Sequence, residues 1–339
     1  MKYKQTEMNR VTLITTLLLF AALVYTSCNN GEKERVILPW VYIEGLTIDN
    51  YPIIDGSTST LPLNTVIACE LMGFNYRWQE AIESNTSTWS IEPQIGEGLR
   101  ERFDKVIKSS QTHNSYINLI DKKADIVLTA RTMSSDERRY AEEKGVNLIE
   151  TPIAIDAFIF IVNPLNPISG LTTGEIQDIY TGRITNWKEL PTFPDNSLWS
   201  TEISPYIRNQ NSGSQELMDL LVMKDLEYYV QLPIYEEKLI PSMPGLIDAI
   251  TNTPFAIGYT VYYYNEQIIR PGNMLKTIGV DGVFPNEQTI DNRSYPYVAE
   301  VYAVIRSDTD ESSMAYKIYE WMQTEAGRQV ISKCGYIPN

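Results

Sequence analysis

Residues 206–223, YIRNQNSGSQELMDLLVM, join an apolar segment ending at Arg208, a turn of small polar residues and an amphipathic helix. Ser212 and Gln215 have the spacing of a capping box, which predicts that the helix begins just after Ser212. The first N–H groups of a helix have no partner within it, and Gly213 lets another molecule approach the backbone. Arg208 adds a planar guanidinium suited to an oxyanion. The alternative is an ordinary strand–turn–helix connection with a surface arginine.

Two further stretches have the same order of features. Residues 55–66, DGSTSTLPLNTV, place four hydroxyl side chains before a helix that carries Pro62 in its first turn. Residues 109–120, SSQTHNSYINLI, place small polar side chains at the start of another helix. Three such helix starts predict N-termini that converge on one anion. Four to six charge-assisted hydrogen bonds would supply on the order of 8 kcal/mol, which corresponds to micromolar binding.

The remaining pattern alternates short apolar runs with helical periodicity, which predicts an α/β fold from residue 52 onward. Residues 154–164, AIDAFIFIVNP, are a continuous apolar run, typical of a strand buried on both faces of a mostly parallel sheet. Residues 311–336 are predicted to form one long helix. The helices are unequal and eight regular units are absent, so an open sheet is expected in place of a barrel.

The N-terminus has the composition of an export signal. Lys2, Lys4 and Arg10 precede the apolar run VTLITTLLLFAALV, which is too short for a comfortable transmembrane helix of roughly 20 residues. The pattern predicts a lipoprotein signal peptide over residues 1–27, with cleavage and lipid attachment at Cys28. The alternative is an ordinary cleaved signal whose cysteine is incidental. Residues 28–51 are interpreted as a tether and lead-in.

The charge of the chain limits its partners. The net charge is −15, and removal of residues 1–27, with three positive charges and one negative charge, leaves it near −17. Nucleic acid or anionic lipid as a broad-surface partner would need a basic footprint that this composition does not favour. A small anion remains compatible, because distant charges are screened beyond roughly 8 Å at physiological salt.

The sequence lacks the residue patterns of several kinds of metal site and enzyme active site. A single histidine, His113, and no cysteine cluster leave nothing to build a zinc site, and neither a metal nor a cofactor is expected. Cys69 and Cys334 either pair or stay as buried thiols. No G-x-S-x-G elbow and no nucleotide P-loop are present, so an enzyme is not expected. His113 is either a ligand contact or a solvated loop side chain.

The quoted stretches, with ADIVLTA at 124–130 and EAGRQVISKCGYIP at 325–338, resemble the extracytoplasmic phosphate-binding proteins of ABC-type phosphate importers. The resemblance covers residues 52–339 and implies a type II periplasmic-binding-protein fold, with two α/β lobes and a ligand cleft between them. Lobe 1 is expected to contain residues 52–155 plus 264–339, and lobe 2 residues 156–263.

The resemblance and the helix starts together predict ligand contacts from both lobes. The expected set is Ser59, Thr60, Leu61, Thr112, His113, Arg131, Arg208, Ser212, Gly213 and Ser214. In well-known members of the family, an aspartate after the second strand accepts the proton of hydrogenphosphate. Ala130 occupies the matching position here, so the resemblance leaves the choice between phosphate and sulfate open. Asp125 and Asp156 are the alternatives for that acceptor.

The implied function is to bind phosphate, or a similar tetrahedral oxyanion, and to deliver it to a membrane ABC permease. The implied protein is a monomer of the cell envelope, lipid-anchored and either periplasmic or surface-exposed. One alternative is a surface lipoprotein that uses the same fold as a scaffold or sensor. Another is a phosphoester hydrolase.

Overall fold

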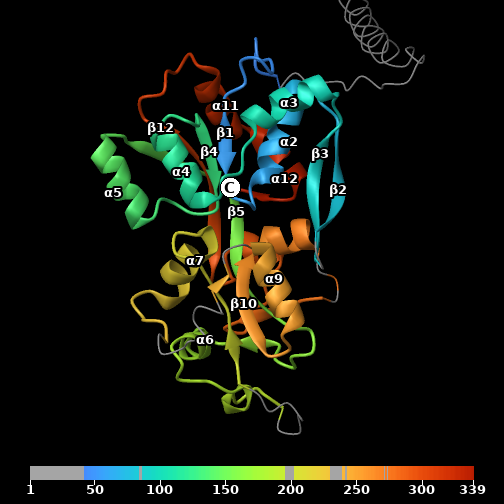
Figure 1. Cartoon of the computed structure of the whole chain (residues 1–339), viewed down its shortest axis with the longest axis vertical. Helices are drawn as coiled ribbons and strands as arrows, with labels where there is room; N and C mark the ends of the chain where they lie inside the picture. The colour runs from blue at the N-terminus through green and yellow to red at the C-terminus, as the bar shows by residue number, and fades with distance from the viewer. Residues whose placement is uncertain are drawn as a thin grey trace, which may run out of the picture. The chain divides into compact units, whose positions relative to one another are not determined.

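One long strand, β5 (Leu148–Val162), connects the two halves of the structure, a computed structural model (Figure 1). The model describes residues 42–83, 86–194, 202–229, 239–240, 243–270, 272 and 274–339. The first part of β5 pairs with β12 (Val298–Arg306) and its last residues pair with β10 (Ala256–Val261). Residues 153–162 are buried, which confirms the prediction of a strand covered on both faces.

The sheet around β5 is mixed, and the prediction of a mostly parallel sheet is wrong. β12, β10, β11 (Lys276–Val280) and β13 (Ile337–Pro338) all run antiparallel to β5. Parallel pairs join β1 (Ile54–Gly56) to β4 (Ile126–Thr129) and β10 to β7 (Ser204–Pro205). An apolar run shows that a strand is buried, but it carries no information on the direction of the neighbouring strands.

The upper half of the structure is defined here as the elements packed around residues 148–157 of β5. Figure 1 shows α4 and α5 on one side of its strands and α2 and α12 on the other. Besides the strands β1, β4 and β12, its elements are α2 (Leu61–Met72), β2 (Tyr76–Glu83), β3 (Thr86–Pro93), α3 (Glu97–Val106), α4 (Thr112–Ile120), α5 (Ser135–Lys144), α11 (Met314–Met322), α12 (Glu325–Cys334) and β13.

The lower half is defined as the elements packed around residues 158–162 of β5. Besides β7, β10 and β11, they are β6 (Gly170–Leu171), α6 (Thr173–Tyr180), η2 (Trp187–Glu189), β8 (Ile207–Arg208), α7 (Gly213–Leu217), η3 (Met218–Met223), β9 (Leu239–Ile240), α9 (Met243–Asn252), η4 (Tyr264–Ile269) and α10 (Glu287–Asp291). The expected lobe division assigns everything after residue 263 to lobe 1. Strand pairing instead places β11 beside Phe160–Val162, in the lower half.

Capping side chains decide where several helices begin. Ser134 accepts from the backbone N–H of Glu137 at the start of α5, and Gly145 ends that helix with a φ of 66°. The predicted single helix over residues 311–336 is wrong, because it is two helices, α11 and α12. Thr324 caps the second helix, with its Oγ1 3.2 Å from the N of Gly327.

The hairpin of β2 and β3 was not predicted. Its strands pair antiparallel from Tyr76 opposite Pro93 to Glu83 opposite Thr86. The guanidinium of Arg270 lies 4.6 Å from the ring of Trp78 and 4.4 Å from that of Trp89. This cation–π contact joins the hairpin to the end of η4. The period-two spacing of aromatic side chains in β2 was the available sequence signal.

Three expectations about cysteines and the membrane have different outcomes. Cys69 and Cys334 are buried and not joined in a disulfide, which agrees with the alternative of buried thiols. Burial raises the pKa of the Cys334 thiol to about 12. The signal peptide and Cys28 lie outside the described residues. Within the described ranges, no helix is both long and apolar enough to cross a bilayer.

Candidate functional site

A cavity of about 380 Å³ lies between the upper and lower halves. The upper half contributes residues 57–59 before α2, residues 111–114 at the start of α4, and Ala130 after β4. The lower half contributes residues 208–214, which join β8 to α7, and Tyr264 at the start of η4. The three predicted helix starts therefore line one cavity.

The start of α7 is joined to Arg208 through Gln215. The Oγ of Ser212 lies 3.3 Å from the backbone N of Gln215, which is the first half of the predicted capping box. The second half is absent, because the side chain of Gln215 does not return to the cap. Its Oε1 accepts instead from the backbone N of Arg208, at 3.0 Å. This bond fixes the arginine backbone against the first turn of α7.

Arg208 places a buried positive charge in the cavity wall. Its Nη1 lies 3.4 Å from the Oγ of Ser214 and 3.5 Å from the Sδ of Met243. Burial lowers the pKa of the guanidinium, but a guanidinium stays charged at neutral pH. Burial also raises the pKa of Tyr264, and Arg208 partly offsets that rise. Because Arg208 is buried, its charge attracts an anion more strongly than it would in bulk water.

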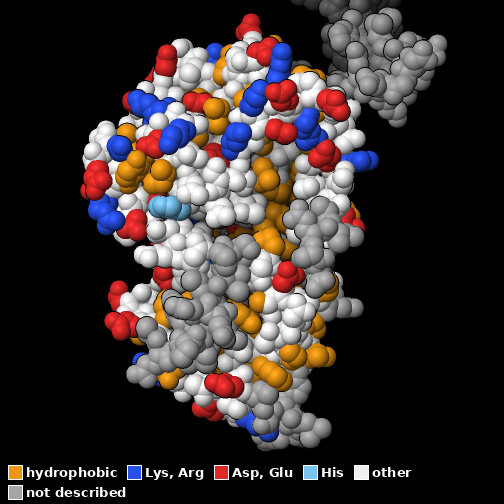
Figure 2. All heavy atoms as spheres, in the orientation of Figure 1, with side chains coloured by type: hydrophobic (Ala, Val, Ile, Leu, Met, Phe, Trp, Pro, Cys, Tyr) orange, Lys and Arg blue, Asp and Glu red, His pale blue; other side chains and the backbone are white. Residues whose placement is uncertain are grey.

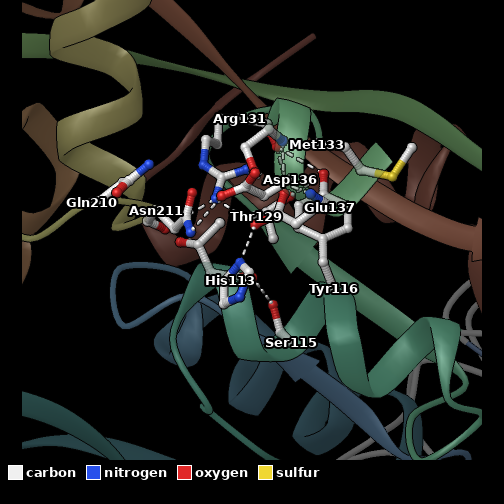
Figure 3. A network of polar contacts seen from close by, with 12 residues as sticks. His113, Ser115, Tyr116, Thr129, Arg131, Met133, Asp136, Glu137, Gln210 and Asn211 are labelled. Carbon is white, nitrogen blue, oxygen red and sulfur yellow. Dashed lines mark hydrogen bonds and ion pairs between the residues drawn. The ribbon is translucent and has the colours of Figure 1, made fainter. Parts of the chain in front are cut away.

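The two halves touch beside the cavity. A Cβ added to Gly213 would lie only 2.6 Å from the Oγ1 of Thr112, so only glycine lets the start of α7 approach the start of α4 so closely. Arg131 donates from Nη2 to the carbonyl oxygen of Asn211 at 3.1 Å. Asn211 donates from Nδ2 to the Oδ2 of Asp136 at 3.2 Å (Figure 3). These contacts hold the segment 208–214 against the upper half.

Arg131 does not line the cavity, which corrects the expectation that it adds a positive group there. Its Nη1 and Nη2 donate to the two carboxylate oxygens of Glu137, at 2.7 and 2.8 Å (Figure 3). The side chains of Arg131 and Glu137 are only 4% and 0% exposed. A charge so deeply buried needs a partner, and this guanidinium is paired with Glu137.

Thr60 and Leu61 are also absent from the cavity wall. The Oγ1 of Thr60 donates to the carbonyl oxygen of Leu128 at 2.7 Å, and its side chain is fully buried. Leu61 packs against the hydrophobic core. The hydroxyls that reach the cavity before α2 belong to Ser57, Thr58 and Ser59.

Most of the predicted ligand set is brought together. The predicted residues in the cavity wall are Ser59, Thr112, His113, Arg208, Ser212, Gly213 and Ser214. The further wall residues, outside that predicted set, are Ser57, Thr58, Gln111, Asn114, Ala130, Asn209, Gln210, Asn211, Leu217, Met243, Pro244, Val261 and Tyr264. Tyr264 is one of several neighbouring tyrosines, and only the fold shows that it reaches the cavity. Met243 had no sequence signal.

His113 bridges the cavity and a buried carboxylate. Its Nδ1 lies 3.0 Å from the Oε1 of Glu137, and its side chain is 34% exposed (Figure 3). The interpretation of His113 as a merely solvated loop side chain does not account for this contact.

Carboxylates are absent from the described part of the cavity wall. Asp125 accepts from the backbone N of Ile53, and Asp156 accepts from those of Ala157 and Tyr263. Neither aspartate lines the cavity, so neither takes the place of an acceptor at Ala130. Across the described ranges, no three histidine, cysteine, aspartate or glutamate side chains are placed to hold a metal ion. The wall offers amides, hydroxyls and a guanidinium, which suit an anion.

The surface shown in Figure 2 has no broad basic patch. Acidic and basic side chains are interspersed on that face. Among the described residues, exposed ion pairs such as Arg102 with Asp49 at 2.8 Å and Lys122 with Asp308 at 3.1 Å also bring the two signs together.

Comparison with known proteins gives consistent matches. Residues 101–325 match the family model described as a PBP superfamily domain. The phosphate-binding protein PstS of Borreliella burgdorferi is 23% identical over 96% of this chain and 97% of its own length. Protein SphX of Synechococcus elongatus is 22% identical, over 77% of this chain and 78% of its own. The solved ABC-type phosphate transport receptor from Vibrio cholerae has the same fold, with a TM-score of 0.56 and 18% identity over 84% of this chain and 99% of its own.

Proposed function

The chain belongs to the PBP superfamily, and from that membership we propose that its cavity binds an inorganic tetrahedral oxyanion, phosphate foremost. The protein would deliver this ligand to a membrane ABC permease. The observation that carries the proposal is the convergence of three helix starts and Arg208 on one cavity. The name and near full-length match of the Borreliella burgdorferi relative support phosphate as the first ligand to test.

The hydrogen-bond donors in the cavity are sufficient to bind an oxyanion with a dissociation constant near micromolar. Hydrogen bonds to a charged group contribute roughly 1.5–3 kcal/mol each, so four to six of them supply on the order of 8 kcal/mol after ordering costs. That free energy corresponds to a dissociation constant near micromolar. The net charge of −15 slows the encounter with an anion more than it weakens the bound state, because distant charges are screened.

The setting we propose is extracytoplasmic. The related PstS and SphX proteins support a binding protein that works outside the cytoplasm. A lipid on Cys28 would hold the protein to the envelope, and the ligand would reach the permease from a monomer. The division into lobes of residues 52–155 plus 264–339 and 156–263 belongs to the same proposal, except that η4, β11 and α10 are grouped with the second lobe. The pairing of β11 with β5 supports this grouping.

A binding role is favoured over hydrolysis. A hydrolase needs a nucleophile in contact with a base. Within the described residues, the only hydrogen bond of the His113 ring goes to Glu137, and no serine or threonine hydroxyl contacts it. The hydroxyls in the cavity are therefore treated as ligand donors.

Titration calorimetry with phosphate, sulfate and arsenate tests the proposal. We expect heat of binding with phosphate in the wild type and a loss of affinity in Arg208→Ala. Arg102→Ala is a matched control, because Arg102 is exposed, pairs with Asp49 and does not line the cavity. No heat with any of the three anions would favour the scaffold or sensor, and turnover of a phosphoester would favour the hydrolase.

A further inference from the structure

His113 lies in the cavity wall, and its hydrogen-bonding direction is set by a group outside the cavity. We propose that the Nε2 of His113 accepts the proton of a protonated oxyanion, so that the cavity selects hydrogenphosphate over sulfate. The inference rests on the proposed function, since it names the form of the ligand that the same cavity takes. In this arrangement the imidazole of His113 is the group that recognises the ligand proton.

The orientation of the imidazole follows from the bonds of Glu137. Both oxygens of Glu137 accept from Arg131, and Oε2 also accepts from the backbone N of Ser134 at 2.7 Å. A carboxylate surrounded by these donors acts as an acceptor, so the Nδ1 of His113 must donate to it across 3.0 Å. In a neutral imidazole only one nitrogen carries a proton. The Nε2 of His113 is then left with a lone pair.

The support behind His113 is rigid. Glu137 is fully buried, its side chain completes the capping box of α5, and Arg131 holds both of its oxygens. The two-point ion pair prevents the carboxylate from rotating away from the ring. Arg131 therefore acts through Glu137 as a positioning residue, although it does not reach the cavity. The buried ion pair of Arg131 with Glu137 therefore orients His113 without lining the cavity itself.

Most other described side chains of the wall do not make the same distinction, because hydroxyls both donate and accept, and Arg208 only donates. The amides of Asn209 and Asn211 are also oriented, since their Nδ2 atoms donate to the carbonyl oxygen of Gln210 and to Asp136, so their Oδ1 atoms are further acceptors. Hydrogenphosphate carries one proton and can donate it to Nε2. Sulfate carries none, so its oxygen would face the lone pair of Nε2 and leave that acceptor unsatisfied. An unmade hydrogen bond of this kind costs enough to change affinity by roughly tenfold to a hundredfold.

Calorimetry at pH 8, where an imidazole is ordinarily neutral, tests the selectivity. We expect His113→Gln to lower the ratio of phosphate to sulfate affinity by at least about tenfold, because a glutamine amide can turn its NH₂ toward sulfate. Asn114→Ala, on the adjacent wall position, is the matched control and should change both affinities by a similar factor. A ratio that stays within about twofold in His113→Gln overturns the inference. A wild type that binds no anion overturns the proposed function itself.

A spectroscopic measurement tests the tautomer without any variant. The chain contains one histidine, so the two ring signals of ¹⁵N-histidine-labelled protein belong to His113. We expect a protonated Nδ1, an unprotonated Nε2, and a shift of the Nε2 signal when phosphate is added. Glu137→Gln should give a mixture of tautomers, because an amide can donate as well as accept. A proton found on Nε2 of the wild type at pH 8 overturns the inference, whether or not the Glu137 variant folds.

Discussion

Asp156 is a buried carboxylate at the point where β5 passes from the upper to the lower half. Its Oδ1 accepts from the backbone N of Ala157 at 2.8 Å and of Tyr263 at 2.9 Å. Its Oδ2 is buried and has no hydrogen-bond partner among the described residues. Burial raises the pKa of Asp156 from 3.8 to about 7, although the backbone donors partly oppose the rise. Replacing Asp156 with asparagine keeps the shape and removes the charge.

The size and sign of the effect follow from proton linkage. A rise of about three pKa units is worth about 4 kcal/mol, at 1.36 kcal/mol per unit. Between pH 4 and pH 7 the folded protein holds a proton on Asp156 that the unfolded chain has lost. The free energy of unfolding therefore falls as the pH rises through this window. Above pH 7 the protein has lost the full amount of about 4 kcal/mol. Asparagine does not ionise, so it adds no pH dependence to the free energy of unfolding. We expect Asp156→Asn to gain up to about 4 kcal/mol relative to wild type between pH 4 and pH 8.

Urea denaturation at pH 4.5, 6 and 8 measures this difference. The new amide is itself a donor that lacks a partner, which costs about 1–3 kcal/mol at every pH, so the change with pH is the diagnostic quantity. Asp125→Asn is the control, because Asp125 also accepts from a backbone N–H but is 40% exposed. Parallel pH profiles for Asp156→Asn and wild type would refute the reasoning.

Three further substitutions test the cavity. Arg208→Ala should cost roughly 2–4 kcal/mol of anion affinity in calorimetry, with the urea midpoint unchanged, since it removes a charged donor from the wall; unaltered affinity would remove Arg208 from the site. Gly213→Ala should weaken binding roughly tenfold, because its Cβ would meet the Oγ1 of Thr112 at 2.6 Å and keep the halves apart; wild-type affinity would show that this approach is not needed. Ala130→Asp should weaken sulfate more than phosphate in paired titrations, because a carboxylate repels an anion that carries no proton; an equal loss of both would contradict a role for position 130 in selectivity.

Local sequence features account for much of the site. The capping signal at Ser212, the hydroxyl run at residues 57–60 and the small polar residues at 109–115 each follow from short-range backbone chemistry. They predicted where helices begin, and all three starts line the same cavity. The apolar run at 154–164 likewise predicted the buried strand that the structure shows as β5.

Other features depended on residues far apart in the chain. The period of an apolar strand does not encode the direction of its neighbours, so the antiparallel partners of β5 could not be predicted. Tyr264 is one of several tyrosines in a row, and its side chain reaches the cavity only because η4 begins beside Arg208.

The sequence by itself determined that this chain alternates strands and helices and has three helix starts with small polar residues. The tertiary structure alone decided which charges face the cavity. Arg131 and Arg208 are the same residue type, and each lies at the end of a short strand: Arg131 two residues after β4 and Arg208 as the last residue of β8. Arg131 lies beside Glu137 and is neutralised by it, whereas Arg208 contacts Ser214 and Met243 in the cavity wall. Electrostatic interactions act through space, so the partner of each arginine was fixed by the folded chain.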